Sequence, residues 1–251
     1  MPISTDLVAF ASLNMPADEV ATSGGGIDLD RRVDFTQIAA NDTIEALSDN
    51  AGDTTQNLTI EARAPNGSVV SETKALTGTT PIAFSTLGTV ERVLLANLSA
   101  DAAGIVTVRR ATGPVTIRVI PATERGFVMM FRKSAADESG GSQRKFYEKF
   151  FWKNLHGTQA LLSAAVAEEA DPETTVDHLL ATAVNDTGTA TNRQTVPTGL
   201  ADGNFNSTSK TVPGTDLGAG AAIGVWLRLT RAAGAAAIRT TYQSKLSGQS
   251  V

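Results

Sequence analysis

The sequence predicts an all-β protein built from two antiparallel, sandwich-like or barrel-like β domains that follow an extended N-terminal arm. From Val33 onward, apolar and polar residues mostly alternate, which is the period of a strand and not of a helix. Turn-forming residues separate these runs at spacings of about eight to twelve residues, as in sandwiches and barrels. Bulky and β-branched side chains, which favour pleated surfaces, are concentrated within the runs.

Residues 1–32 are predicted to form the N-terminal arm. They carry few large apolar side chains, and the Ser-Gly-Gly-Gly run at 23–26 indicates a flexible break. A polar arm of this kind becomes ordered when its few apolar residues find a partner. We therefore expect Leu7, Phe10 and Leu13 to dock on a neighbouring subunit.

Residues 33–131 are predicted to be the first β domain. Apolar residues alternate with polar ones over 58–62, and a Pro-Asn-Gly turn then leads into the segment 69–76. The segments 105–110 and 115–120 repeat this arrangement around a Gly-Pro turn. Each pair is therefore expected to form an antiparallel hairpin.

A polar, glycine-containing segment at 132–142 is expected to be a linker, and residues 143–251 the second β domain. Within this domain, residues 176–184 are expected to form a strand, with a short helix as the alternative, and residues 185–218 long loops with one short strand. Alternation over 223–230, and again from Ile238 to Leu246, predicts a closing hairpin with its tip at Ala233-Gly234.

The second domain opens with the most aromatic stretch of the chain, residues 144–153. Successive side chains of a strand point to opposite faces. One face would carry Phe146, Glu148, Phe150 and Trp152, and the other a lysine-fringed aromatic platform of Tyr147, Lys149, Phe151 and Lys153. We expect a core strand. The alternative is a platform for single-stranded nucleic acid, which stacks its bases on aromatic rings.

Composition excludes several classes of function. The formal net charge is -5, and the basic residues are scattered, so we expect no direct binding of nucleic acid. The chain has no cysteine, which excludes disulfides, thiolate metal sites and thiol catalysis. The first residues lack the pattern of a signal peptide. The sequence contains no run of about 18 apolar residues, which is the length that a membrane-spanning helix needs.

No residue pattern predicts an enzyme, a cofactor site or a metal site. His156 precedes a glycine and is expected to be a turn residue, whereas His178 alternates with Val176 and Leu180 as a satisfied, partly buried histidine would. The acidic residues at 168–173 lack the spacing of a calcium loop and are expected to form a solvated loop.

Candidate interface residues come from the arm, the second hairpin and the aromatic strands. Arg109 and Arg118 would emerge from facing strands as a local basic patch, suited to an acidic neighbouring subunit. The aromatic candidates are those on the platform and on the late strand: Tyr147, Phe151, Trp152 and Trp226.

Four segments resemble virion structural proteins of tailed bacteriophages: residues 42–49, 59–63, 149–157 and 223–229. The resemblance spans most of the chain, but it consists of general sequence character and short similar segments and includes no diagnostic motif. It implies a β-rich, multimeric particle protein without enzymatic activity. The resemblance identifies no functional residue in this chain. It also does not indicate whether the protein would lie in the head, the neck or the tail of a virus particle.

From these observations we expect a virion protein made in the host cytoplasm, most simply a decoration or cement protein on the outer surface of an icosahedral capsid. Its partners would be the major capsid protein or other virion proteins, together with copies of itself, and neither nucleic acid nor a membrane. Three alternatives remain: a tail, neck or baseplate component; a carbohydrate-binding or receptor-binding protein that uses the face of Trp152 or Trp226; and a β-sandwich hydrolase with acidic catalytic residues.

Overall fold

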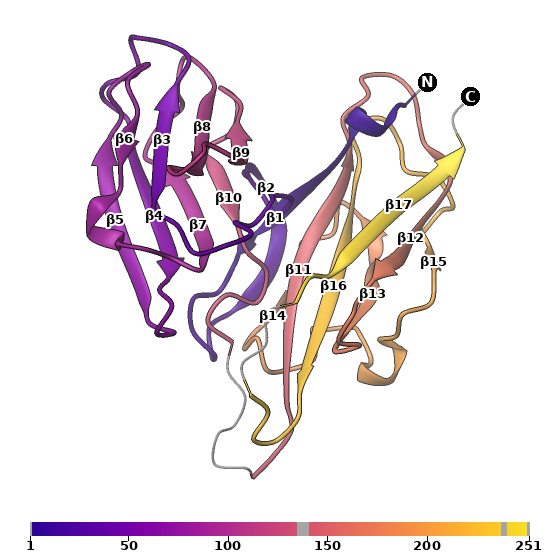
Figure 1. The fold of residues 1–251 in the computed structure, drawn as a ribbon. Helices are drawn as coiled ribbons and strands as arrows, with labels where there is room; N and C mark the ends of the chain where they lie inside the picture. Colours follow the sequence, from indigo (N-terminus) through magenta and orange to yellow (C-terminus); the bar gives the residue numbers. More distant parts are fainter. Residues whose placement is uncertain (1, 135–140, 237–239, 250–251) are drawn as a thin grey trace. The chain divides into compact units, whose positions relative to one another are not determined.

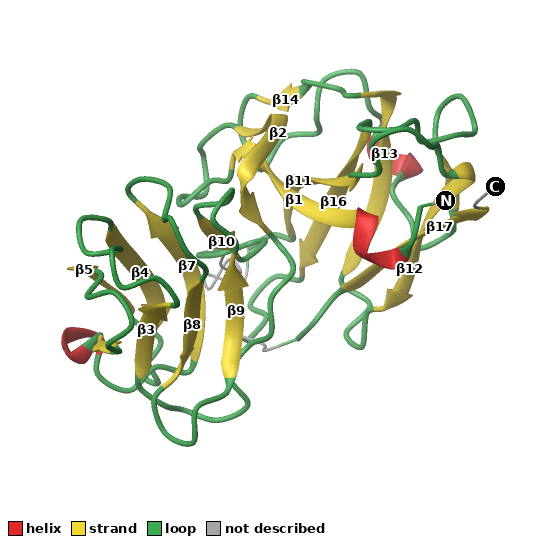
Figure 2. Cartoon of the chain, turned by 90° about the horizontal axis from the view of Figure 1, so that it is seen from above, coloured by secondary structure: helices red, strands yellow, loops and turns green. Residues whose placement is uncertain are grey.

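The computed structural model describes residues 2–134, 141–236 and 240–249, and it confirms the all-β class. The chain forms two compact units. One is continuous, Leu29–Met129, and is called the inserted unit. The other is made of Met1–Asp28 and Met130–Val251 and is called the split unit. Figure 1 colours both along the sequence, and Figure 2 shows that strands and loops make up almost all of the chain.

The inserted unit is Leu29–Met129, where the sequence predicts a first domain at residues 33–131, and residues 1–28 do not form a separate arm. They belong to the split unit, where β1 (Leu7–Asn14) pairs antiparallel with β11 (Arg144–Asn154) and β2 (Ser23–Arg32) follows. Most of β1 is buried, so it lacks the alternation that marks a strand with one wet face. Residues 135–140 of the expected linker lie outside the described residues.

The expected flexible break at residues 23–26 is instead the start of β2. Gly24 has φ +85°, and a Cβ built there would lie 2.4 Å from Cη2 of Trp226. Glycine is therefore needed for close approach to the indole ring, and a side chain at this position would displace the ring or the strand. The sequence predicts a flexible break at these glycines because a run of glycines does not show which side chain packs against it.

The inserted unit is a sandwich of two sheets that enclose one apolar core. The first sheet runs from the end of β2 through four strands in the order β10 (Gly126–Val128), β7 (Arg92–Leu98), β4 (Asn57–Arg63) and β5 (Val69–Ala75). The second has the order β6 (Ile82–Ala83), β3 (Ile44–Ser48), β8 (Val106–Arg110) and β9 (Thr116–Ile120), and the turn η2 (Ser85–Leu87) precedes β7.

Both hairpins predicted for this unit are confirmed. β4 pairs antiparallel with β5 over its whole length, and β8 pairs antiparallel with β9. The buried residues of β4 are the alternating apolar ones, Leu58, Ile60 and Ala62. Local sequence suffices here because a short turn places each strand directly beside its partner.

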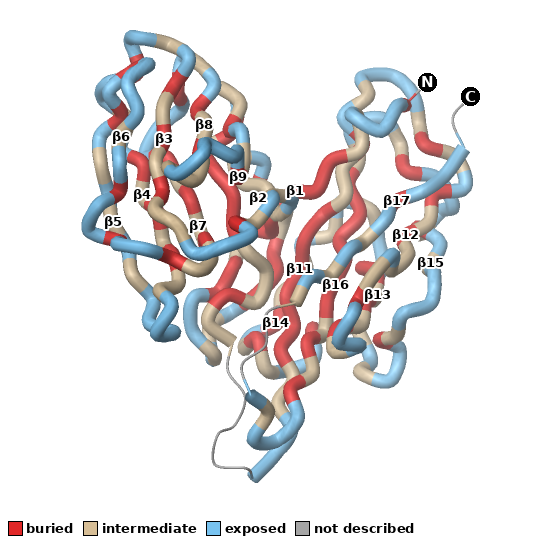
Figure 3. Tube along the Cα trace, in the orientation of Figure 1, coloured by how far each residue is buried: buried red, intermediate tan, exposed pale blue. Residues whose placement is uncertain are grey.

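The split unit is organised around β11, which lies between β1 and β16 (Ala222–Arg231). The sheet order is β13 (Val176–Val184), β16, β11, β1 and the start of β2, and β14 (Thr189–Ala190) pairs with β2. A second sheet has the order β15 (Lys210–Thr211), β12 (Leu162–Ala170) and β17 (Gln243–Gln249). The helical turns are η1 (Ser4–Asp6) and η3 (Asp202–Asn204). Figure 3 shows the buried stretches of β11 and β16.

The predicted closing hairpin is wrong. β16 lies between β11 and β13, whereas β17 pairs with β12 in the other sheet. Most of β16 is buried, and such a strand needs a partner on both edges. Neighbours in sequence do not have to pair when a longer aromatic strand offers a better buried partner. Residues 237–239 of the expected second strand lie outside the described residues.

None of the helices described by the structure is long and apolar enough to cross a membrane.

Gly126→Ala is expected to destabilise the inserted unit. A Cβ at Gly126 would lie 1.9 Å from the carbonyl oxygen of Ala96 on β7, so β10 and β7 would have to separate. We expect a loss of about 1–3 kcal/mol in the free energy of unfolding, measured by denaturant titration. Gly157→Ala is the control, because a Cβ there meets nothing within 4 Å, and an equal loss in both variants would contradict the steric explanation.

Candidate functional site

β11 places two oppositely charged residues side by side in the interior of the split unit. Its residues 146–151 are all buried, as expected of a core strand, so the alternative of an exposed aromatic platform does not hold. Glu148 is 1% exposed and Lys149 is fully buried. Because neighbouring residues of a strand point to opposite faces, each face of β11 contains one charge that needs its own compensation.

On the first face, the carboxylate of Glu148 faces the fully buried guanidinium of Arg193, with 3.2 Å between Oε1 and Nη2. The N–H of Phe131 donates to Glu148 Oε2 at 2.6 Å. Arg193 also lies over the ring of Phe146, 5.1 Å from its centroid. Burial raises the pKa of Glu148, and the charge of Arg193 and the N–H of Phe131 oppose this shift.

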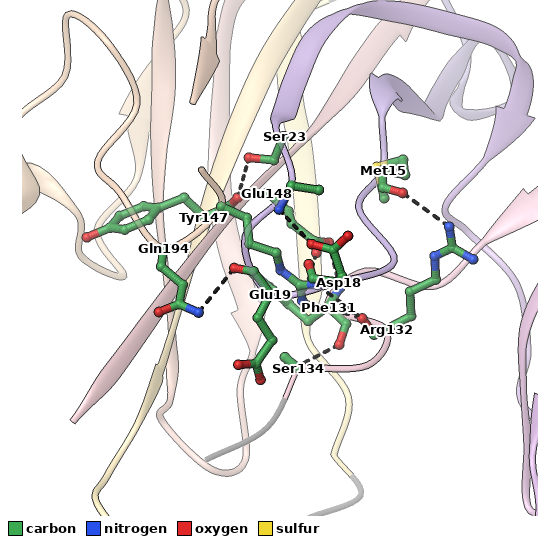
Figure 4. Close-up of polar contacts among 12 residues, drawn as sticks. Met15, Asp18, Glu19, Ser23, Phe131, Arg132, Ser134, Tyr147, Glu148 and Gln194 are labelled. Atoms are coloured by element: carbon green, nitrogen blue, oxygen red, sulfur yellow. Dashed lines mark hydrogen bonds and ion pairs between the residues drawn. The ribbon is translucent and has the colours of Figure 1, made fainter. Parts of the chain in front are cut away.

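The same arginine holds the loop of residues 15–22 between β1 and β2. Arg193 Nη1 donates to the carbonyl of Asp18 at 2.9 Å, and the amide of Gln194 donates to the carbonyl of Glu19 at 3.1 Å. Arg132 donates to the carbonyl of Met15 at 3.1 Å. Figure 4 shows these contacts converging on one side of β11. The 15–22 loop is thus held by three side chains from two other segments of the chain.

Two further sets of contacts make the loop rigid. Within it, Asp18 Oδ1 accepts the N–H groups of Val20 and Ala21 at 2.9 and 2.7 Å, which is the capping geometry of a turn. At its edge, Arg144 pairs with Glu19 at 2.6 Å. The loop therefore has a defined conformation.

This rigid loop carries apolar side chains outward. Val20 is 66% exposed within the loop, and Leu13, at the end of β1, is 59% exposed. These are the two highest exposures among the large apolar residues that the structure describes. Val20 is thus exposed on a loop whose backbone is held by Arg193, Gln194 and Arg132.

On the opposite face of β11, Lys149 is enclosed by two aromatic rings. Its Nζ lies 5.0 Å from the ring centroid of Phe151 and 5.1 Å from that of Trp226. It donates to Asp186 Oδ2 at 2.7 Å and to the carbonyl of Gly188 at 2.6 Å. Burial lowers the pKa of Lys149, and Asp186 counteracts this. The lysine thereby holds the 186–188 segment on the sheet.

Asp202 of η3 is the centre of a second polar cluster. Its carboxylate accepts from Lys145 Nζ and from the hydroxyl of Tyr147, each at 2.6 Å, and from Arg228 Nη1 at 2.9 Å. The hydrogen bonds from Lys145 and Tyr147 hold the pKa of Asp202 well below its usual range. Arg228 also pairs with Asp177 of β13. The cluster ties the loop containing Asp202 to β11, β13 and β16.

The interior beside β12 and β13 contains a third polar group. His178 is fully buried; its Nδ1 lies 3.3 Å from the hydroxyl of Tyr242, and Nε2 has no partner at hydrogen-bonding geometry among the described residues. Burial and the charge of Lys210 lower the pKa of His178. The histidine is thus more deeply buried, and less satisfied, than its alternation with apolar residues predicts.

The acidic run at 168–173 is not the expected solvated loop. Glu168 and Glu169 lie in β12, and Asp171 is buried, where its Oδ2 accepts the N–H of Val176 at 2.8 Å. No group of three or more His, Asp and Glu residues in the described part of the chain is placed to hold a metal ion. His156 does serve in a turn, because its Nδ1 accepts from the N–H of Thr158 and Gln159.

Most of the aromatic interface candidates are core residues. Phe10, Tyr147, Phe151 and Trp226 are all at most 4% exposed, so no partner can reach them in this fold. Trp152 is half-buried, and its indole N–H donates to Ser244 of β17 at 3.1 Å. A glycan-binding face on Trp226 is therefore not present. Aromatic side chains in alternation cannot reveal whether a strand lies at the edge or in the centre of a sheet.

The other candidates remain at or near the surface. Leu13 is exposed and Leu7 is half-buried. The two arginines do not form an open basic patch, because Arg109 pairs with Glu45 at 2.6 Å and Arg118 faces Glu124 at 3.5 Å. Each arginine is thus compensated within its own unit.

Sequence reasoning missed Arg193 and Asp202. Arg193 and Asp202 lie in the polar region interpreted as long loops, where single charged residues carry no local pattern. A possible signal was the presence of Glu148 and Lys149 in the middle of an aromatic strand, since two buried charges require partners elsewhere.

Arg193→Met is expected to lower the free energy of unfolding by about 3–5 kcal/mol, because Glu148 is left buried without its partner. Adding Glu148→Gln should recover part of this loss, since the amide is uncharged and its oxygen still accepts from Phe131. Denaturant titration of the wild type, both single variants and the double variant measures the coupling. Strict additivity of the two losses would show that the ion pair is not the cause.

Asp202→Asn is expected to remove part of the acid sensitivity of the protein. The pKa of Asp202 is lower in the folded protein than in the unfolded chain, so its contribution to stability is fully present above about pH 4 and is lost as the pH falls through the folded pKa. The variant should be less stable than the wild type at pH 7, and the difference should shrink below pH 4.

Tyr147→Phe is the companion variant, because it removes one hydrogen bond and keeps the carboxylate with Lys145 and Arg228. It should retain part of the pH dependence. A stability difference between Asp202→Asn and the wild type that is constant from pH 7 to pH 2 would contradict the assignment.

The chain matches no protein-family model, no curated protein and no solved structure at a significant level. Its function is therefore argued from the geometry of its own residues.

Proposed function

We propose that this protein is a noncatalytic structural component of a virus particle, a decoration protein that binds the outer surface of the capsid. The observation that carries the proposal is the 15–22 loop, which side chains from other segments hold in place and which exposes Val20, while Leu13 is exposed at the end of β1. The resemblance of four segments to virion proteins of tailed bacteriophages supports the choice of partner.

The polar interior supports a binding role for this surface. Glu148 and Arg193 join β11 to the 15–22 loop, so the loop is held by the most buried charges of the unit. A loop ordered before binding loses little conformational entropy when it meets its partner. The buried ion pair is costly for stability alone, and positioning a contact loop gives it a reason to be retained.

The proposed mechanism is stabilisation by linkage. A protein that binds the assembled shell and not its dissociated subunits shifts the equilibrium toward the shell. The apolar side chains of Leu13 and Val20 would be buried against the capsid, and the charged residues around them, Asp18 and Glu19, would face its polar rim.

Val20→Asp and Leu13→Asp are expected to weaken capsid binding at least about tenfold, because each places a charge where an apolar contact is buried. Both residues are exposed in the protein alone, so the stability of the fold should change little. Co-sedimentation of purified protein with capsids that lack it measures the binding.

Val115→Asp is the matched control, since Val115 is 49% exposed and belongs to the inserted unit. It should bind as the wild type does. Wild-type protein that stays in the supernatant at micromolar concentration would refute the capsid partner, and full binding by Val20→Asp would refute the role of the loop.

A further inference from the structure

A second feature of the molecule points to association between copies of the chain, and it does not depend on the proposed capsid partner. β5 is the last strand of its sheet in the inserted unit and pairs only with β4. It is seven residues long, and its exposed and half-buried residues alternate along its length, as Figure 3 shows. An unpaired edge of this length is a template for another strand.

The direction of each backbone group of β5 follows from the hydrogen bonds at the two ends of the hairpin. The N–H of Ala64 donates to the carbonyl of Ser68, and the N–H of Leu76 donates to the carbonyl of Gln56. The register between them has no bulge, so the even-numbered residues of β5 bond to β4. The backbone N–H and C=O groups of Val69, Ser71, Thr73 and Ala75 consequently point away from the sheet.

No backbone hydrogen bond within the described residues uses these outward groups. Two of the other edges are partly covered, whereas β17 is an edge strand that pairs with β12. At β9, the N–H of Thr36 donates to Ile117; at β13, His178 and Asn206 form a bridge. β5 contains no proline or bulge, and its two charges, Glu72 and Lys74, lie on the half-buried face, where they pair with each other at 3.2 Å. Glu72 also accepts the N–H groups of Thr86 and Leu87, and Lys74 donates to the carbonyl of Ala83, so both charges are engaged within the unit while the outward backbone groups of β5 stay uncovered.

The sequence of β5 favours a second copy of itself as the occupant. The outward N–H and C=O groups of one β5 must bond to those of the other. An antiparallel pair about a two-fold axis therefore places the odd-numbered residues of the two copies opposite each other. An axis at Glu72 would place Glu72 opposite Glu72, and an axis at Lys74 would place Lys74 opposite Lys74. An axis at Ser71 would place Glu72 opposite Val70, whereas an axis at Thr73 places Glu72 opposite Lys74 twice and so brings opposite charges near each other.

We propose that β5 pairs antiparallel with β5 of a second copy, with Thr73 opposite Thr73 and Ser71 opposite Ala75. The first sheets of two inserted units then continue into each other, and about six backbone hydrogen bonds join the copies. Thr73 already bonds to Thr59 of β4 through its hydroxyl at 2.8 Å, so the exposed face next to the axis is held in place before pairing.

The absence of cysteine makes this register directly testable by disulfide trapping. In the proposed pair the two Thr73 Cα atoms lie about 5.5 Å apart, within the range of a disulfide. Thr73→Cys should form a covalent dimer under mild oxidation. Ser71→Cys should not, because its two copies would lie about 13 Å apart.

Thr59→Cys is the matched control for random collision. It lies on the same face one strand inward, opposite Thr73, and it loses the same hydroxyl hydrogen bond. Dimer formation by Thr73→Cys at least about tenfold faster than by Thr59→Cys supports the proposal. Equal rates for the two variants, or faster trapping of Ser71→Cys, would overturn it.

Light scattering with the unmodified chain provides the second measurement. Ser71→Pro removes one outward N–H and no bond to β4, so it should raise the dimer dissociation constant at least about tenfold, whereas Ser71→Ala should leave it unchanged. A wild type that remains monomeric at about 100 μM would overturn the proposal. Loss of capsid binding with dimerisation intact would instead count against the loop, so the two proposals fail separately.

Discussion

The ion pair between Glu148 and Arg193 is the constraint on which the split unit depends. A carboxylate in the centre of a buried strand is tolerated only with an opposite charge and hydrogen bonds around it. Those partners come from residues 131–132 and from Arg193, and Arg193 also binds the 15–22 loop. The requirement to neutralise one side chain thus brings three distant segments of the chain together.

The inserted unit uses a buried carboxylate in a similar way. Asp53 is 1% exposed and accepts hydrogen bonds from Ser48 and from the N–H groups of Ala103 and Gly104. Burial acts to raise the pKa of Asp53, but these hydrogen bonds outweigh it and lower the pKa. In both units, then, buried acidic groups position loops, which is a structural use of side chains that elsewhere perform catalysis.

The two surfaces singled out differ in what they offer a partner. The 15–22 loop offers apolar side chains on a backbone that is already satisfied, so its specificity would come from shape and burial. The edge of β5 offers unsatisfied backbone groups, so its specificity would come from register and from the pairing of Glu72 with Lys74.

The sequence by itself determined the all-β class and the two hairpins of the inserted unit. In each hairpin a short turn and alternating apolar residues leave only one partner within reach. Only the tertiary structure decided that residues 1–28 complete the split unit, that β16 pairs with β11, and that Arg193 neutralises Glu148. These contacts join segments far apart in the chain, and the burial that selects them exists only after both sides have folded.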